Sequence, residues 1–241
     1  MAILYIVATP IGNLQDISFR AIEVLKGVDF ILAEDTRVTK KLLSHYNVKT
    51  PLLSYHQHSQ LEKIDHILKL LEQGKNLALV SDAGTPGVSD PGNKLVEEVV
   101  KPLRDKVRII PIPGPSALTA AASISGFPMD KFLFLGFPPA KKKRKKFFEE
   151  VGNSKYPVVF YESCHRILKT LEELKELSSL ISRKELSSLK VVVCHELTKM
   201  FEKTYRGTIP EVLDKMKDRD LRGEFVIIIS NQKPKKDEEK I

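Results

Sequence analysis

The sequence predicts an α/β protein: a largely parallel sheet covered by helices, followed by a second α/β domain. Short apolar runs rich in β-branched residues alternate with amphipathic stretches through the first half of the chain. The pattern changes around Pro111–Phe137, where three prolines mark a turn before a helix of small residues. A length of 241 residues suits one large domain or two modest ones. These observations together favour two α/β domains.

Five apolar runs of the first half are the expected strands. They are Ile3–Ala8, Asp29–Ala33, Leu52–Tyr55, Leu77–Val80 and Val107–Ile112. The clearest helix between them is Leu61–Leu71, because leucine and isoleucine recur there at helical spacing. The preceding Ser59–Glu62 has the pattern of a capping box, and Gly74 is the expected stop.

The second domain is expected to begin at about residue 117. Its predicted strands are Phe132–Phe137, Val158–Tyr161, Val191–Cys194 and Phe225–Ile229, and its predicted helices are Ser116–Ser125, Ile167–Leu177 and one opened by the capping box Thr208–Glu211. The charged tail Lys233–Ile241 is expected to be frayed. We therefore divide the chain into residues 1–116, carrying cofactor and substrate loops, residues 117–232, completing the cofactor cleft, and the tail 233–241.

The composition excludes several classes of protein. Hydrophobic residues make up 42% and charged residues 29%, the balance of a globular chain. No apolar run approaches the roughly 18–20 residues that a membrane span needs. The N-terminus lacks the basic region of a signal peptide, and two cysteines form no disulfide framework. We expect a cytoplasmic protein, and the net charge of +8 permits a polyanionic partner.

Three turns follow predicted strands, where open α/β sheets bind ligands. They span residues 8–16, 81–92 and 111–117. None has the glycine spacing of a standard nucleotide-binding motif. In the second turn Asp82 stands at a strand end and is expected to contact a ligand. Asp90 is expected to cap a helix with Pro91 at its first position.

Eight motifs occur together and in order along the chain. They are ATPIGNLQD (8–16), AEDTR (33–37), SYHQH (54–58), SDAGTPGVSDPG (81–92), PGPSA (113–117), YESCHR (161–166), ELTK (196–199) and GEF (223–225). The set closely resembles the RsmI family, ribosomal small-subunit RNA 2′-O-methyltransferases of the tetrapyrrole methylase fold. The resemblance implies two α/β domains with S-adenosylmethionine in the cleft between them, a homodimer, no metal, and a decoding-region cytidine of 16S rRNA in the small ribosomal subunit as substrate.

The resemblance also implies which residues contact S-adenosylmethionine. Matched position by position, they are Pro10, Asp82, Ala83, Gly84, Thr85, Ser116, Ala117, Tyr161 and Glu162. Backbone groups on tight turns suit the methionine and adenine moieties, and a carboxylate suits the ribose or the sulfonium.

Methyl transfer to a ribose hydroxyl is helped by a general base. The candidates are Glu34 and Asp35 in AEDTR, His56 with His58 in SYHQH, and Lys199 in ELTK. Asp35 or His56 is expected nearest the reacting hydroxyl, and Arg37 is a candidate RNA contact. Three alternatives stay open: AEDTR as a salt-bridged helix start, the histidines as surface residues, and Lys199 as a phosphate contact.

Six adjacent basic residues form what we call the basic run. They are Lys141, Lys142, Lys143, Arg144, Lys145 and Lys146. Such a run is costly without a polyanion, so we expect it to contact rRNA, with a solvated helix start as the alternative. Phe147 and Phe148 are expected to anchor the following helix in the core.

Three further interpretations compete with these expectations. The pairs Cys164–His165 and Cys194–His195 could suggest zinc, but they lack the spacing of known zinc sites. A methyltransferase acting on a small tetrapyrrole or corrinoid precursor would share the fold. A non-enzymatic RNA-binding or assembly factor would not need the three turns, and it would not bind S-adenosylmethionine without RNA.

Overall fold

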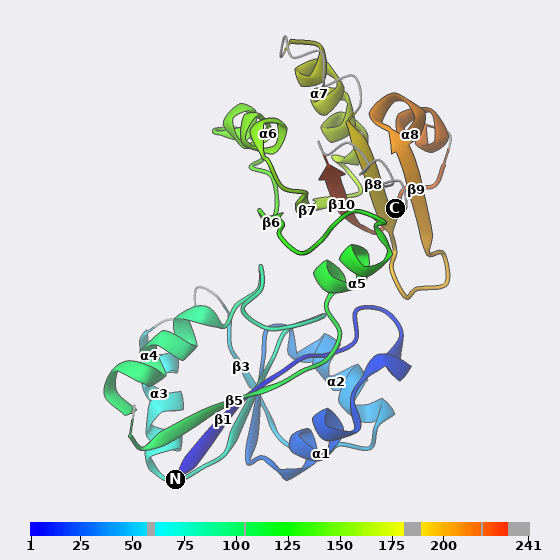
Figure 1. Cartoon of the computed structure of the whole chain (residues 1–241). Helices are drawn as coiled ribbons and strands as arrows, with labels where there is room; N and C mark the ends of the chain where they lie inside the picture. Colours follow the sequence, from blue (N-terminus) through cyan, green and yellow to red (C-terminus); the bar gives the residue numbers. More distant parts are fainter. Residues whose placement is uncertain (57–60, 104, 181–188, 218, 231–241) are drawn as a thin grey trace, which may run out of the picture. The chain divides into compact units, whose positions relative to one another are not determined.

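The computed structural model describes residues 1–56, 61–103, 105–180, 189–217 and 219–230 (Figure 1). The chain divides into two compact units, Met1–Ser116 and Ala117–Ile241. The charged tail and the serine that opens the predicted capping box at Ser59–Glu62 lie outside the described residues. Within the described ranges, no helix has the length and apolar character needed to cross a membrane.

The first unit contains a five-stranded parallel sheet with the strand order β3-β2-β4-β1-β5. Its strands are β1 (Ala2–Val7), β2 (Phe30–Ala33), β3 (Leu52–Ser54), β4 (Leu77–Val80) and β5 (Val107–Ile112). Each lies within one residue of its predicted bounds. The parallel sheet of the first domain is thereby confirmed.

Helices cover both faces of this sheet (Figure 1). They are α1 (Phe19–Gly27), α2 (Thr36–His45), α3 (Leu61–Glu72) and α4 (Asn93–Leu103), with a short 3₁₀ helix, η1, at Leu14–Asp16. Leu4 and Leu79 belong to the core under α3 and α4, whereas Val7 and Val80 belong to the core under α1 and α2. Burial on both faces explains why these strands are continuous apolar runs rather than alternating ones.

Two predicted helix ends have different outcomes. After α3, Gly74 adopts φ +84° and its N–H donates to the carbonyl of Leu71, so the predicted stop is confirmed. The predicted start of α4 at Pro91 is wrong, because the helix begins at Asn93. Gly92 has φ +154°, a conformation that no helical residue adopts, so the turn extends past Pro91.

The second unit contains a mixed sheet with the order β6-β7-β10-β8-β9. Its strands are β6 (Leu133–Phe134), β7 (Val158–Ser163), β8 (Lys190–His195), β9 (Lys203–Thr208) and β10 (Glu224–Ser230). β6 pairs with β7 in parallel, and the other three pairings are antiparallel. The polar edge strand β9 has no apolar run, and the sequence did not predict it.

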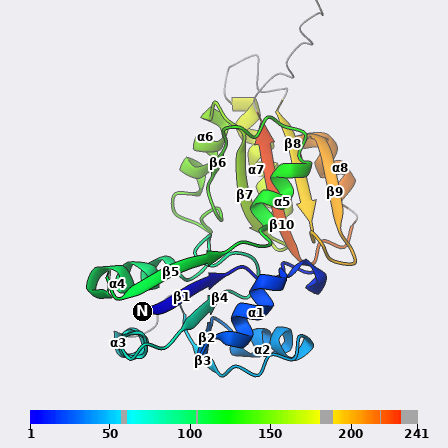
Figure 2. The ribbon, with the colours of Figure 1, turned by 60° about the horizontal axis from the view of Figure 1, so that its bottom comes forward.

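Among the described residues of this unit, four helices pack on its sheet (Figure 2). They are α5 (Ala117–Ile124), α6 (Arg144–Asn153), α7 (Ile167–Leu180) and α8 (Ile209–Met216). The helices α6, α7 and α8 share one core with alternate residues of the central strands, including Phe160 and Ile227. α5 lies on the opposite face, against β10 and β7. Phe147 and Phe148 are buried in the shared core, which confirms their predicted anchoring role.

Candidate active site

The turns after β1, β4 and β5 are tied together at the carboxyl edge of the first sheet. The backbone of Thr9 exchanges two hydrogen bonds with Gly84, at 2.8 Å from the Thr9 N–H and 3.0 Å from the Gly84 N–H. The Thr85 hydroxyl donates to the carbonyl of Pro115 at 3.1 Å. The three turns singled out in the sequence therefore meet at one place, as expected for strands that all run in the same direction.

The turn after β2 lies at the same edge of the sheet and contacts the turn after β4 through Asp82. The N–H of Asp35 donates to Oδ1 of Asp82 at 3.0 Å, so the acidic motif AEDTR lies beside the turn after β4. The second carboxylate oxygen of Asp82 has no partner among the described residues, and the residue is exposed. Asp82 thus keeps an acceptor atom that a ligand could use, and its contact with a ligand stays a prediction.

Asp35 begins α2 and is held by Arg37. Its Oδ1 accepts from the Arg37 N–H at 2.8 Å, which is the hydrogen bond of a helix N-cap. The Arg37 guanidinium also binds both carboxylate oxygens, with Nη2 at 2.7 Å from Oδ2. These hydrogen bonds hold the pKa of Asp35 well below its usual range. A carboxylate so stabilised is a weak base, which favours the salt-bridged helix start for this residue.

An open pocket of about 390 Å³ lies beside this helix start. Its lining residues come from the ends of β2 and β3 and are Glu34, Asp35, Thr36, Arg37, Ser54 and His56. A hydrogen bond joins Ser54 Oγ and His56 Nε2 at 2.9 Å. The pocket therefore gathers a carboxylate, an imidazole and a guanidinium. His58 lies outside the described residues.

Glu34 differs from Asp35 in its electrostatic surroundings. Partial burial raises the pKa of Glu34, and the negative charge of Asp82 raises it further, whereas His56 opposes the shift. The carboxylate of Glu34 accepts no hydrogen bond from the residues that the structure describes. A carboxylate with a raised pKa and free acceptor atoms beside an open pocket is suited to accept a proton.

Lys199 belongs to the second unit and is held by two carboxylates. Its Nζ donates to Glu196 Oε1 at 2.8 Å and to Glu224 Oε2 at 3.0 Å. Burial disfavours the ammonium, but these two hydrogen bonds outweigh it and raise the pKa of Lys199. The side chain therefore stays charged at neutral pH, which suits a phosphate contact better than a general base.

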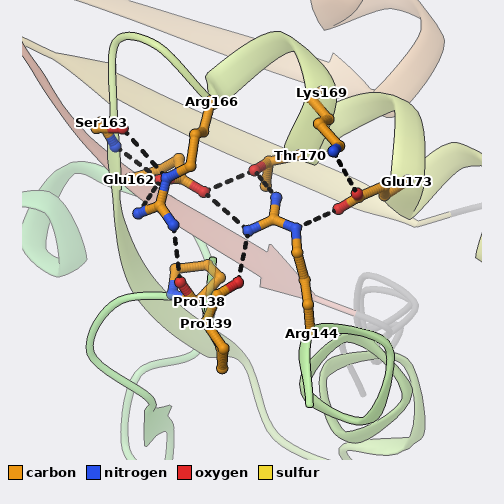
Figure 3. Close-up of polar contacts among 9 residues, drawn as sticks. All are labelled: Pro138, Pro139, Arg144, Glu162, Ser163, Arg166, Lys169, Thr170 and Glu173. Carbon is orange, nitrogen blue, oxygen red and sulfur yellow. Dashed lines mark hydrogen bonds and ion pairs between the residues drawn. The ribbon is translucent and has the colours of Figure 1, made fainter. Parts of the chain in front are cut away.

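The buried carboxylate of Glu162 is engaged within its own unit. Oε1 accepts from the N–H of Ser163 at 2.8 Å and pairs with Arg166, and Oε2 accepts from the Thr170 hydroxyl at 2.6 Å (Figure 3). The residue is only 1% exposed. The carboxylate of Glu162 thus has structural partners within its own unit, and its contact with the cofactor stays a prediction. The neighbouring Tyr161 ring packs edge-on against Phe134 and Phe137.

The basic run is not uniformly exposed. Its five lysines are exposed, as an RNA contact requires, but Arg144 is only 7% exposed. Its guanidinium donates to Glu173 and Thr170, each at 2.7 Å, and to the carbonyl of Pro139 at 3.2 Å (Figure 3). The expectation that the Arg144 side chain contacts RNA is therefore wrong, because its guanidinium is buried and hydrogen-bonded within its own unit.

The cysteine–histidine pairs lie in different surroundings. Burial raises the pKa of the Cys194 thiol to about 11, and the His195 ring stacks on Phe225 with its Nε2 hydrogen-bonded to the carbonyl of Arg222. Cys164 is half-buried. Across the described ranges, no three histidine, cysteine, aspartate or glutamate side chains come together as a metal site would require.

Some residues of the site escaped the sequence analysis. Ser54 starts the motif SYHQH and lies two residues before His56, so an extended strand end places both side chains on one face, but the sequence analysis did not single it out. Thr9 and Pro115 act through backbone atoms that join the turns, and no side-chain pattern signals such a role. Arg166 and Thr170 became identifiable only once Glu162 was seen to be buried.

The turns fit S-adenosylmethionine, the cofactor that the resemblance implies. Gly84 adopts φ +77°, which favours glycine, and its backbone exchanges two hydrogen bonds with Thr9, so the conformation of this turn is fixed. Asp82 supplies a carboxylate oxygen for a hydroxyl or a positively charged group. Residues 82–85 with Pro10 would hold the cofactor, and Ser116, Ala117 and Tyr161 remain predicted contacts. Its place in a cleft between the domains stays a prediction.

Comparison with known proteins identifies the family. Residues 3–213 match the model of the tetrapyrrole (corrin/porphyrin) methylases. Two proteins named ribosomal RNA small subunit methyltransferase I are similar: one from Halalkalibacterium halodurans, 42% identical over 99% of this chain and 79% of its own, and one from Thermotoga maritima, 41% identical over 96% of this chain and all of its own.

Solved structures agree on the fold. The cobalt precorrin-4 methyltransferase CbiF has a TM-score of 0.66 at 20% identity, covering 96% of both chains. The methyltransferase CobJ has a TM-score of 0.65 at 16% identity, covering 96% of this chain and 95% of its own. The chain therefore belongs to the tetrapyrrole methylase family and, within it, to the ribosomal RNA small subunit methyltransferases I, which are S-adenosylmethionine-dependent enzymes.

Proposed function

We propose that this protein methylates the ribose 2′-hydroxyl of a decoding-region cytidine in 16S rRNA, within the small ribosomal subunit. The observation that carries the proposal is the pocket at the ends of β2 and β3, which combines Glu34, His56 and Arg37. A proton acceptor beside a cation suits an RNA ribose flanked by phosphates. The names of the similar proteins support the RNA class of the substrate. We further propose a cytoplasmic homodimer.

In the proposed mechanism, Glu34 acts as the general base. S-adenosylmethionine supplies an activated methyl group on a positively charged sulfur. Glu34 would take the proton of the ribose hydroxyl as that oxygen is alkylated; the bound cofactor would supply the methyl group and retain the sulfur. His56 lies close enough to Glu34 to influence its charge, and the raised pKa of Glu34 increases its basicity. Alignment of the reacting atoms supplies much of the remaining rate.

Arg37 is positioned for a phosphate of the RNA backbone. Its side chain is 88% exposed, yet Asp35 fixes one side of the guanidinium. A fixed arginine loses less side-chain entropy on binding than a free one. Asp35 is therefore a positioning residue in this proposal, acting through Arg37 and the start of α2.

The molecule that accepts the methyl group distinguishes the proposed function from its alternative, methylation of a small tetrapyrrole or corrinoid precursor. Purified protein is given S-adenosylmethionine labelled in the methyl group, with small ribosomal subunits lacking the modification or with a corrinoid precursor. We expect label in the RNA of the subunits alone. Label in the corrinoid alone would contradict the proposal, and absence of S-adenosylmethionine binding would favour the non-enzymatic RNA binder.

A further inference from the structure

Two arginines hold successive carbonyls of the segment that leads into the basic run. Arg166 Nη1 donates to the carbonyl of Pro138 at 3.0 Å, and Arg144 Nη1 donates to that of Pro139 at 3.2 Å (Figure 3). Proline has no N–H, so neither residue can donate a backbone hydrogen bond to a neighbouring strand. The path of this segment is therefore fixed by side chains from α6 and from the turn before α7.

Both arginines converge on Glu162 of β7. Arg166 Nη2 lies 2.8 Å from Oε1, and Arg144 Nη1 lies 3.7 Å from Oε2. The Thr170 hydroxyl joins the two sides, donating to Glu162 Oε2 at 2.6 Å and accepting from Arg144 Nη2 at 2.7 Å. A buried carboxylate is tolerated only when it is paired and hydrogen-bonded, so these contacts constrain one another.

The basic run begins two residues after Pro139. Lys141, Lys142 and Lys143 are exposed, and Lys143 has the left-handed φ of +66° just before α6. Arg144 then places its guanidinium 4.9 Å from the centre of the Phe148 ring. The three lysines therefore lie between two anchored parts of the chain, the prolines before them and Arg144 after them.

We propose that Arg144, Arg166 and Glu162 are positioning residues for RNA binding: their network fixes the segment 138–143 so that its lysines meet phosphates together. The inference rests on the proposed function, because it concerns how the RNA substrate is held. It assigns the one buried member of the basic run a role in binding without any contact to RNA.

The salt dependence of binding to small ribosomal subunits tests this role. Each phosphate contact contributes about 0.7–0.9 to the slope of log affinity against log salt concentration. Lys142→Met is the matched control, and it should reduce the magnitude of the slope by the equivalent of about one phosphate contact. Arg144→Met removes the same charge from a side chain that cannot reach a phosphate. We expect this variant to reduce the magnitude of the slope by the equivalent of at least two phosphate contacts. Its affinity for S-adenosylmethionine should be unchanged.

Thr170→Val is the second variant, because it keeps the side-chain volume and every charge while removing the bridging hydroxyl. This variant should also reduce the magnitude of the salt-dependence slope. If Arg144→Met does not fold, the test depends on Thr170→Val. Wild-type slopes in the folded variants, with only lowered thermal stability, would overturn the inference. If the wild-type protein shows no salt-dependent binding to the subunits, the proposed function fails first and the inference with it.

Discussion

Glu34 and Asp35 are neighbours in the chain, but the structure gives their carboxylates opposite acid strengths. Arg37 binds both oxygens of Asp35 and lowers the pKa of that group. Glu34 is partly buried, faces the charge of Asp82, and has a raised pKa. Because a general base needs a pKa closer to the working pH, Glu34 rather than Asp35 is the proton acceptor in our account.

Replacing Glu34 by Gln removes the base while keeping its shape. We expect kcat for methyl transfer to fall by about 10²–10⁴-fold, the usual contribution of general base catalysis. The affinity for S-adenosylmethionine should stay unchanged, because Glu34 is not among the proposed cofactor contacts. Single-turnover transfer to small ribosomal subunits measures the first quantity, and equilibrium binding measures the second.

Two further variants control this measurement. Asp35→Asn keeps an oxygen that can accept from the N–H of Arg37, so it should preserve the helix cap and kcat. Loss of the ion pair to Arg37 should appear only as weaker binding of the RNA substrate. Glu72→Gln removes a carboxylate from the exposed end of α3 and should change nothing. Turnover of Glu34→Gln within twofold of wild type would exclude Glu34 as the base.

The raised pKa of Glu34 predicts the pH dependence of turnover. The pKa of Glu34 lies above its ordinary value of 4.5, and only the ionised carboxylate can act as a base. Because Glu34 becomes protonated as the pH decreases through this raised pKa, kcat should fall there. By linkage, the folded chain holds this proton more tightly than the unfolded chain, so ionisation of Glu34 reduces stability as the pH rises between the two values. A pH–rate profile that keeps its acidic limb in Glu34→Gln would contradict the assignment.

The sequence could nominate these residues but could not rank them. AEDTR offers two adjacent acids. Their pKa values differ because the Arg37 guanidinium binds Asp35, whereas Glu34 is partly buried and lies near the charge of Asp82, a residue distant in the sequence. Arg144 illustrates the same limit. Six adjacent basic residues appear equivalent in the sequence, and only the buried Glu162 and Thr170 distinguish one of them.

At the scale of elements, the turn between β4 and α4 depends on backbone conformations available to glycine. Gly84, Gly87 and Gly92 all have φ in the positive range, at +77°, +85° and +154°. A Cβ on Gly92 would lie 3.0 Å from the backbone nitrogen of Gly87 and 3.2 Å from Leu79 Cδ2. The turn thus brings its backbone close to the end of β4, where the predicted cofactor contacts lie.

Gly92→Ala should destabilise the protein by about 1–3 kcal/mol, because alanine rarely adopts this conformation and its Cβ meets backbone. Gly27→Ala is the matched control, since a Cβ there meets nothing within 4 Å and the site lies at the end of α1. It should be neutral or slightly stabilising. Urea unfolding measures both changes, and equal midpoints for the two variants would contradict this account of the turn.

Strands buried on both faces were predictable, because their apolar runs are continuous and bounded by turns. The edge strand β9 was not, since KTYRGT is polar and half exposed and gains its strand conformation by pairing with β8. The start of α4 was misplaced because Asp90–Pro91 has the pattern of a helix start, whereas the conformation of Gly92 postpones the helix.

At the scale of the whole molecule, the two units use different sheets for different tasks. The parallel sheet of the first unit brings every strand's carboxyl end to one edge, which gathers Thr9, Glu34, His56 and Asp82. The mixed sheet of the second unit supports the buried network behind the basic run. Periodicity predicted both units as α/β, but strand direction in the second depends on pairings that local sequence does not encode.

The central claim is that the methyl group is added to a ribose oxygen of 16S rRNA. Small ribosomal subunits lacking the modification are incubated with the protein and labelled S-adenosylmethionine, and the recovered RNA is hydrolysed in alkali. Alkaline cleavage requires a free 2′-hydroxyl, so we predict a labelled fragment that resists cleavage at one cytidine. Label released in an ordinary mononucleotide would place the methyl group on a base and contradict the account.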